Sequence, residues 1–316
     1  MKAPILLVDG NNLLARNQYV FRTAKAADGF PIGGLFGACR SLRAFLGAEP
    51  CRGVIVAFDR GVPAFRRQLC PEYKAQRAEK RTAEDEEMRA AYTAQAAIAH
   101  QLFLPMGIAT ASAEGWEADD VIGGLTLDTL SDQELIIFSS DRDYTQLVTS
   151  DLRVRMWDCG KNSWVAPDQF FCLKRCLDPK QSDNLDGVPG VGPVRANQVM
   201  SAFISSLEEK DYANPDFSRE QCRIFLEWAK EQANKDGGIV EKICDRIVES
   251  AQKVRCNWRC THMHEIVSEC SEEIRVRTSN ASRSKFIKQV RRFGMLGILE
   301  DLGAFWPPFE RLEIVL

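Results

Sequence analysis

Residues 4–9 read Pro-Ile-Leu-Leu-Val-Asp, a short apolar run that stops at an aspartate. The pattern recurs twice: Val54–Phe58 is followed by Asp59, and Leu135–Ser140 is followed by Asp141. Short apolar runs of this kind are typical of buried strands. Because helical patterns separate them, the sequence predicts parallel βαβ units and a sheet covered on both faces.

The first half of the chain alternates between strand and helix patterns. Strands are predicted at Pro4–Val8, Gly53–Phe58, Leu135–Phe138 and Leu152–Trp157, and helices at Gly33–Leu46, Glu84–Leu104 and Ala118–Leu130. Thr82-x-x-Asp85 predicts a capping box before the second of these helices.

The second half has a different character. Pro167–Leu177 and Val194–Phe203 have helical spacing around the glycine-rich turn at 187–192, whereas residues 211–238 are polar and are predicted to be loop-rich. We therefore place a soft domain boundary near residue 166.

Composition limits the protein class. The 316 residues are 45% hydrophobic, and no apolar run approaches the ~20 residues of a membrane span. We expect no signal peptide, and eleven cysteines, an odd number mostly in apolar surroundings, fit reduced thiols in a cytoplasm. The net charge of −3 argues against a nucleic-acid partner only if charge is evenly spread, and residues 60–81 hold seven basic residues against two acidic ones.

The aspartates at the strand ends are expected to share one space, because the carboxyl ends of parallel strands form the ligand crevice of an open α/β sheet. Glu117, Asp119 and Asp120 begin a predicted helix, and Asp143 and Asp183 follow later. Taken singly, such acids are most often turn formers or helix caps. Seven or eight together would repel one another unless cations neutralise them. With no comparable set of His or Cys, the chemistry favours Mg²⁺ or Mn²⁺, and two such ions ~4 Å apart suit phosphodiester cleavage.

Five segments in sequence then resemble a known family. They are LLVDGNNLLAR at 6–16, AFDRGVPAFRRQLCPEYKAQR at 57–77, GWEADDVIG at 115–123, SSDRDYTQLV at 139–148 and SDNLDGVPGVGPVRA at 182–196. In this order they resemble the 5′–3′ exonuclease domain of bacterial DNA polymerase I and the free-standing phage flap endonucleases.

The resemblance implies an architecture. It implies a PIN-like 5′ nuclease catalytic domain at 1–166, with a mostly parallel sheet, flanking helices and a helical arch at about 60–104. A C-terminal helical domain at 167–316 would contain a helix-three-turn-helix element at about 170–205.

The resemblance also implies roles for individual residues. Metal binding falls to Asp9, Asp59, Glu117, Asp119, Asp120, Asp141, Asp143 and Asp183. Contact with the scissile phosphate falls to Lys74 and Arg77. Further DNA contacts are expected at Arg16, Arg66, Lys80, Arg81, Gly190, Gly192 and Arg195, and K⁺ is a candidate at the glycine-rich turn. Such backbone contacts carry no base sequence, so recognition should be of DNA structure.

Two features depart from this pattern. The family usually has an acid three residues before the position of Asp183, where this chain has Lys180. The second metal site therefore lacks one expected carboxylate. Asp178 can substitute, the Lys180 ammonium can take the place of a cation, the ion can bind weakly and arrive with DNA, or Lys180 points outward and the ligand is simply lost. The segment Cys256-x3-Cys260-x-His262-x-His264 has cysteine spacing suited to zinc, but its alternation predicts a strand, which closes a tetrahedral site poorly.

The sequence thus predicts a metal-dependent 5′ nuclease that acts on DNA flaps, nicks or free 5′ ends, and on RNA primers as a further candidate substrate. We expect a monomer in the cytoplasm of a bacterial or phage-infected cell, functionally linked to a separate DNA polymerase. Two alternatives remain: a structure-specific DNA-binding protein with impaired catalysis, and a PIN-type ribonuclease.

Overall fold

A computed structural model describes residues 2–62, 64–75, 81–179, 183–208, 211, 217–235, 238–265 and 267–316, without the side chains of 268 and 269. The chain forms two compact units. The first comprises Met1–Val62, Arg81–Pro167 and Val267–Leu316, and the second comprises Pro63–Lys80 and Asp168–Ile266. No helix among the described residues is long and apolar enough to cross a membrane.

The first unit is built on a seven-stranded sheet with the order β6-β5-β4-β1-β2-β3-β7. The strands are β1 (Ile5–Asp9), β2 (Gly53–Ala57), β3 (Ala109–Ser112), β4 (Leu135–Ser139), β5 (Val154–Asp158), β6 (Ser163–Trp164) and β7 (Arg275–Arg277). Pairing is parallel from β3 through β5, and antiparallel only where β6 and β7 join the two edges. Every residue of β1, β2 and β4 is buried, as the apolar runs predicted for a sheet covered on both faces.

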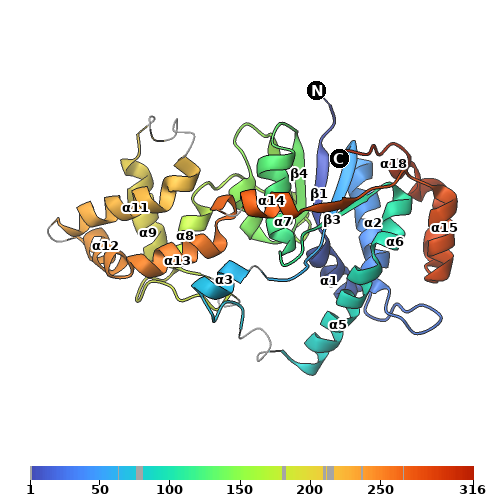
Figure 1. Ribbon diagram of the computed structural model, residues 1–316, viewed down its shortest axis with the longest axis horizontal. Helices are drawn as coiled ribbons and strands as arrows, with labels where there is room; N and C mark the ends of the chain where they lie inside the picture. The colour runs from blue at the N-terminus through green and yellow to red at the C-terminus, as the bar shows by residue number, and fades with distance from the viewer. Residues whose placement is uncertain are drawn as a thin grey trace. The chain divides into compact units, whose positions relative to one another are not determined.

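Helices cover both faces of this sheet (Figure 1). One face packs against α1 (Gly10–Val20), α2 (Gly33–Ala48), α6 (His100–Phe103), η1 (Leu104–Met106), α15 (Arg283–Arg292), α16 (Leu296–Leu299), α17 (Leu302–Phe305) and α18 (Pro307–Glu310). The strands also contact α7 (Ala118–Gly124), which continues into a π-helical turn, η2 (Leu125–Thr129), and packs against α14 (Val267–Glu273). A 3-10 helix, η3 (Arg142–Leu147), follows β4.

Helix α5 (Ala83–Ile98) packs against α1 and α2, and its predicted capping box is present. The side chain of Thr82 accepts from Asp85 N at 3.1 Å, and Thr82 N donates to Asp85 Oδ2 at 3.1 Å. Two buried glutamines join these helices. Gln95 Nε2 donates to Gln18 Oε1 at 2.8 Å.

The same glutamines satisfy the first turn of α2, whose N-cap residue offers no side-chain bond. Gly34 N donates to Gln18 Oε1 at 3.1 Å, and Leu35 N donates to Gln95 Oε1 at 2.9 Å. Since the first N–H groups of a helix lack partners within the helix, these side chains replace the missing cap.

The second unit is helical. It contains α3 (Ala64–Leu69), α8 (Phe171–Leu177), α9 (Pro193–Ser206), α11 (Phe217–Ala233), α12 (Ile239–Glu249), α13 (Ala251–Thr261) and η5 (Met263–Glu265). Its core gathers around Phe203, Phe225 and Trp258, all buried. The two helices expected on either side of the glycine-rich turn are α8 and α9.

Several sequence expectations need correction. The change of unit at Pro167 lies beside the expected boundary at 166, but residues 267–316 belong to the first unit rather than to a C-terminal helical domain. Residues 211–238, expected to be loop-rich, contain the 17-residue helix α11. Its polar composition hid a one-sided apolar face, which includes Phe217, Phe225 and Leu226. The expected arch at 60–104 is shared between the units, and its residues 76–80 lie outside the described part of the chain.

Candidate active site

Three parallel strands of the first unit end at one edge of the sheet. The last residue of β1, Asp9, is level with Ala57 at the end of β2, and Val8 is level with Phe138 of β4. Asp59 and Asp141 follow the ends of β2 and β4 and so lie at that same edge, as the sequence predicted.

Consecutive residues at the start of α1 tie these strand ends together. Asn11 Oδ1 accepts from Asp59 N at 3.0 Å, while Asn12 Oδ1 accepts from Ser140 N at 3.2 Å and Ser140 Oγ at 2.9 Å. Gly10 is required before them, because a Cβ there would lie 2.7 Å from a carbonyl oxygen of β2. The Asp-Gly-Asn-Asn sequence therefore orders the edge as well as supplying an acid.

Asp9 is held by three donors. Asn12 N donates to its Oδ1 at 2.9 Å, and Tyr144 Oη and Ser139 Oγ donate to its Oδ2 at 3.1 and 3.3 Å. Burial raises the pKa of Tyr144 well above its ordinary value, so its hydroxyl keeps its proton and remains a donor.

The same edge concentrates negative charge. The pKa of Asp9 is raised to about 7, mainly by burial; the charges of Asp59, Asp141 and Asp119 act in the same direction, and the bond from Asn12 N acts in the opposite one. Carboxylates from four chain segments are therefore close enough to repel one another, which is the situation that a bound cation relieves.

The first turn of α7 brings three carboxylates together, one of them Asp119. Oxygen atoms of Glu117, Asp119 and Asp120 lie within 4.8 Å of one another, and among the described residues this is the only such group of three acids, cysteines or histidines. Glu117 N donates to Asp120 Oδ2 at 3.2 Å, Asp120 N to Asp119 Oδ1 at 2.8 Å, and Ala118 N to Asp59 Oδ1 at 2.7 Å. The acids thus act as helix caps and still form a cluster of oxygen donors. An all-oxygen donor set fits a hard divalent cation.

Asp143 lies in η3, two residues after Asp141, and belongs to the first unit as well. Its backbone N–H donates to Asp141 Oδ1 at 3.1 Å, and Asp141 N donates to Ser139 Oγ at 3.0 Å. Asp183 belongs to the second unit.

In that second unit, the structure brings Lys74 and Asp183 together. Lys74 N donates to the Asp183 carbonyl at 2.9 Å, and Asn184 Nδ2 donates to the Glu72 carbonyl at 2.8 Å. Lys74 and Asn184 both have a positive φ, 57° and 52°, in a region that side chains seldom adopt. The Lys74 ammonium lies over the Tyr73 ring, 4.8 Å from its centroid.

The carboxylate of Asp183 is buried beside a cation. Arg175 Nη2 lies 3.4 Å from Asp183 Oδ2, and the side chains are 15% and 8% exposed. This ion pair was missed because no motif marks Arg175. Lys180, on which the sequence argument for a weakened second site rests, lies outside the described residues.

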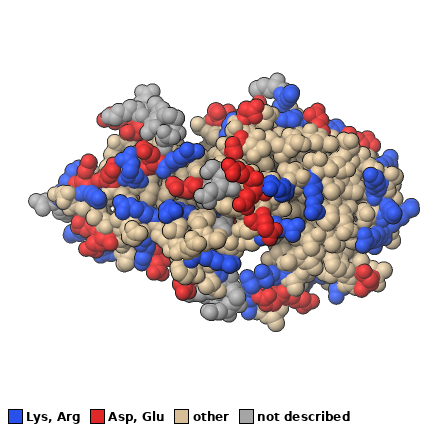
Figure 2. Space-filling model, viewed as in Figure 1, with Lys and Arg blue, Asp and Glu red and all other residues tan. Residues whose placement is uncertain are grey.

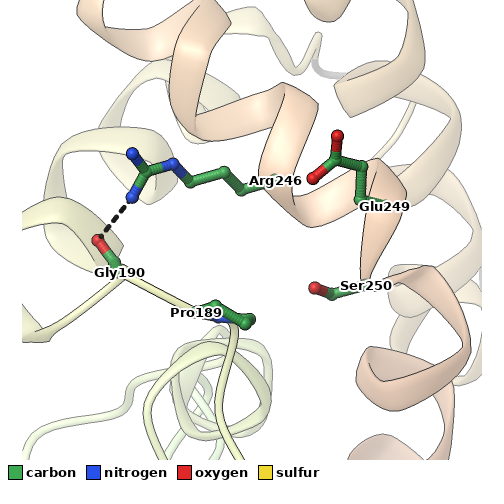
Figure 3. A pocket seen from close by; sticks show the side chains of 5 residues that line it. All are labelled: Pro189, Gly190, Arg246, Glu249 and Ser250. Atoms are coloured by element: carbon green, nitrogen blue, oxygen red, sulfur yellow. Dashed lines mark hydrogen bonds between the residues drawn. The ribbon is translucent and has the colours of Figure 1, made fainter.

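Two arginines face the glycine-rich turn before α9, and Figure 3 shows one of them, Arg246. Arg195 Nη1 donates to the Gly190 carbonyl at 2.6 Å, and Arg246 Nη1, from α12, approaches the same oxygen at 3.4 Å. Gly190 has φ +71°, and a Cβ there would collide with Arg246. Arg246, Pro189 and Ser250 contribute to the lining of an adjoining pocket of about 300 Å³. Gly192 caps α9 with an ordinary extended backbone and open space around it.

The remaining basic candidates differ in their surroundings. Arg16 is exposed and donates to the Cys159 carbonyl, and Arg81 pairs with Glu86 at 2.8 Å. Arg66, expected to contact DNA, is only 3% exposed and donates from Nε to the Cys260 carbonyl at 2.9 Å, so it holds α3 on α13 instead. Arg77 and Lys80 lie outside the described residues.

The cysteine- and histidine-containing segment is not the strand that its alternation predicted. Cys256 and Cys260 lie in α13, and His262 stacks on Trp258 with 3.9 Å between ring centroids. His264 stacks in turn on His262 at 5.0 Å. Burial lowers the pKa of both histidines, that of His264 to about 4. The segment is part of the helical core.

Comparison with known proteins extends this description. The family profile described as "5'-3' exonuclease, N-terminal resolvase-like domain" matches residues 4–173. A thermostable DNA polymerase I of Thermus filiformis is 31% identical over 234 residues, which are 71% of this chain and 27% of the relative. A 5'-3' exonuclease of Buchnera aphidicola subsp. Acyrthosiphon pisum is 27% identical over 249 residues, covering 73% of this chain and 83% of the relative.

A solved structure of T5 5'-exonuclease with bound zinc shares the fold. Its TM-score is 0.64 at 18% identity, over 92% of this chain and 98% of that one. The chain spans about a quarter of the length of the polymerase relatives. Since the family profile covers more than half of the chain and includes the whole acidic edge, the protein belongs to the 5′–3′ exonuclease family.

Proposed function

We propose that this protein is a divalent-metal-dependent 5′ nuclease that hydrolyses DNA phosphodiester bonds near junctions of single strand and duplex. The observation that carries the proposal is the convergence of Asp9, Asp59, Asp119 and Asp141 on one edge of the sheet, with Glu117 and Asp120 beside Asp119. Without cations, so many carboxylates would be costly to keep ionised at one place.

The residues fit Mg²⁺ or Mn²⁺ better than a soft metal, because their donors are carboxylate oxygens. Bound there, such an ion would supply a water of lowered pKa and positive charge beside the phosphate. The chain's part is to fix the donors: N–H groups at the start of α7 orient Asp59, Asp119 and Asp120, and Tyr144 and Ser139 orient Asp9.

The second unit offers cations for the DNA backbone. We expect Lys74 to contact the scissile phosphate and Arg195 to contact a phosphate of the duplex, as in the family pattern. Arg195 and Arg246 already face the Gly190 carbonyl, so we expect these guanidinium groups to reduce any requirement for K⁺ at this turn. Equal DNA affinity in K⁺ and Na⁺ would agree with this, whereas a strong K⁺ requirement would contradict it.

The test is cleavage of a 5′-flap DNA with and without Mg²⁺, alongside Asp119→Ala. We expect metal-dependent cutting near the junction that Asp119→Ala abolishes. Binding of the flap without any metal-dependent product would favour the alternative of a DNA-binding protein with impaired catalysis. Equal cutting of single-stranded RNA would favour the ribonuclease alternative.

Nicked, gapped and RNA-primed duplexes in the same assay would rank the substrates. We expect activity as a monomer in a cytoplasm, next to a separate DNA polymerase. We also retain the expectation that Lys180 weakens a second metal site. Lys180→Asp should then lower the Mg²⁺ concentration that gives half-maximal cleavage, and an unchanged requirement would contradict the idea.

A further inference from the structure

The last part of the first unit carries an unusual concentration of positive charge. Between Ile274 and Leu299 the sequence has seven arginines and lysines and no acid, in a chain whose net charge is −3. Two of the seven, Arg275 and Arg277, lie in β7, and the other five lie in α15. All seven are exposed. We call them the basic surface.

Four of the five basic residues of α15 lie away from its buried side, and the fifth, Arg283, is exposed in the first turn. Phe286 and Val290 are fully buried against the core, whereas Lys285, Lys288 and Arg291 are exposed. At 100° per residue, these three and Arg292 fall on the side of the helix opposite Phe286 and Val290. Figure 2 shows Lys and Arg gathered at the right-hand end of this face, where Figure 1 draws α15.

Within the described part of the chain, these charges are not paired with acids. Among the residues that the structure describes, none of the seven makes a salt bridge. Arg292 donates to Gln101 Oε1 at 2.9 Å, and Arg275 donates to the carbonyl of Glu272 at 3.2 Å. Both contacts are to neutral oxygens, so neither one pairs the guanidinium with an acid.

The basic surface also reaches toward the acidic edge. Arg275 pairs with Ser112, the last residue of β3, at the edge where the acids lie. Arg277 and Arg60 both act electrostatically on His100, whose pKa is lowered mainly by burial and further by these two charges. Since Arg60 directly follows Asp59 in the chain, His100 is acted on both by a cation of β7 and by a cation next to the acidic edge.

We propose that the basic surface binds the sugar-phosphate backbone of the nucleic-acid substrate on the catalytic unit. This rests on the proposed function. Charged residues on an edge strand can simply prevent unwanted sheet pairing, which would account for Arg275 and Arg277. That explanation does not extend to α15. The aromatic residues of the segment, Phe286 and Phe293, are buried, so no base can stack there. Contact is with phosphates, and independent of sequence.

The first experiment measures binding of a 5′-flap DNA in EDTA at several salt concentrations. The variant Lys285→Gln, Lys288→Gln, Arg291→Gln is compared with Lys161→Gln, Lys230→Gln, Lys242→Gln. Both remove three exposed cations, so they change net charge equally. If each α15 residue meets one duplex phosphate, the slope of log K against log salt becomes shallower by about 2 to 3, and affinity at ~0.1 M salt falls at least about tenfold. The control should stay close to wild type.

The second experiment needs no variant. Acetylation of lysines in the wild-type protein, read by mass spectrometry, should show Lys285 and Lys288 protected by flap DNA and Lys161 unprotected. This guards against loss of binding through misfolding of α15.

The outcomes separate the two proposals. An unchanged salt slope, together with Lys285 and Lys288 still reactive in the complex, would overturn the basic surface as a nucleic-acid site. In that case the surface would suit an acidic protein partner instead. Failure of wild-type protein to cut the flap would count against the proposed nuclease, while the binding and protection results could still stand.

Discussion

The hydroxyl of Tyr144 offers a sharp test of how the acidic edge is organised. It donates to Asp9 Oδ2 at 3.1 Å, and Ser139 Oγ shares that oxygen at 3.3 Å. Tyr144 is 1% exposed, so water cannot readily replace the donor. Tyr144→Phe removes one oxygen atom and leaves the ring in place. We expect the fold to survive and the orientation of the Asp9 carboxylate to loosen.

The size of the effect follows from the charge on the acceptor. A hydrogen bond to an ionised group contributes about 1.5–3 kcal/mol, and losing a bond that orients a metal ligand typically costs ~10–100-fold in metal affinity. The Mg²⁺ concentration for half-maximal cleavage of a 5′ flap should therefore rise about 10–100-fold. The rate at saturating Mg²⁺ should fall much less, because the ligands themselves remain.

The matched control is Tyr92→Phe, which removes the same atom from a half-buried tyrosine of α5 in the same unit. Its Mg²⁺ dependence should match wild type. Thermal stabilisation of each protein by Mn²⁺ gives a second readout that does not need activity. If the Mg²⁺ and Mn²⁺ responses of Tyr144→Phe superimpose on those of wild type, Tyr144 does not position Asp9 and the reasoning is wrong.

Three further substitutions test other contacts. Gln95→Leu leaves the buried Leu35 N–H without its acceptor and should lower the free energy of unfolding by about 2–4 kcal/mol in urea, with exposed Gln252→Leu as control. The folded pKa of His264, about 4, lies below its unfolded value of 6.5, so His264 should contribute a loss of stability of roughly 3 kcal/mol as pH drops from 6.5 to 4; His264→Gln should remove that share, while His262, whose pKa is also lowered, keeps its own. Arg175→Met removes the cation beside buried Asp183, so the free energy of unfolding in EDTA should fall by about 3 kcal/mol. If Asp183 binds metal, the Mg²⁺ concentration required for cleavage should also drop. A stability equal to that of the wild type would refute the pairing of Arg175 with Asp183.

The sequence predicted the centre of the sheet well and its edges poorly. Strands β1, β2 and β4 are continuous apolar runs because both of their faces are covered, and such runs are easy to recognise. In contrast, β3 reads Ala-Thr-Ala-Ser and β7 reads Arg-Val-Arg, which lack that signal. Their strand geometry comes from pairing with a neighbour, and β7 follows β3 in the chain by more than 160 residues. Local patterns carry no information about such a partner.

The candidate site likewise contains residues that the sequence identifies and residues that it does not. Position after a strand was enough to predict that Asp9, Asp59 and Asp141 share an edge. Tyr144 could not be assigned, because a tyrosine after a strand looks like an ordinary core residue. Arg66 shows the opposite case: a basic run suggests an exposed surface, yet its guanidinium donates to a carbonyl of α13, nearly 200 residues away in the chain.

For the acids of this edge, a role as helix caps does not exclude a role as metal ligands. Asp59, Asp119 and Asp120 each accept a backbone N–H at the start of α7, and Asp141 accepts one at the start of η3. Each of these bonds fixes one carboxylate oxygen and so sets the direction of the other. The N–H groups also lower the cost of placing negative charges together. Capping is therefore compatible with the proposed cation binding, and a capping role in the structure is no argument against it.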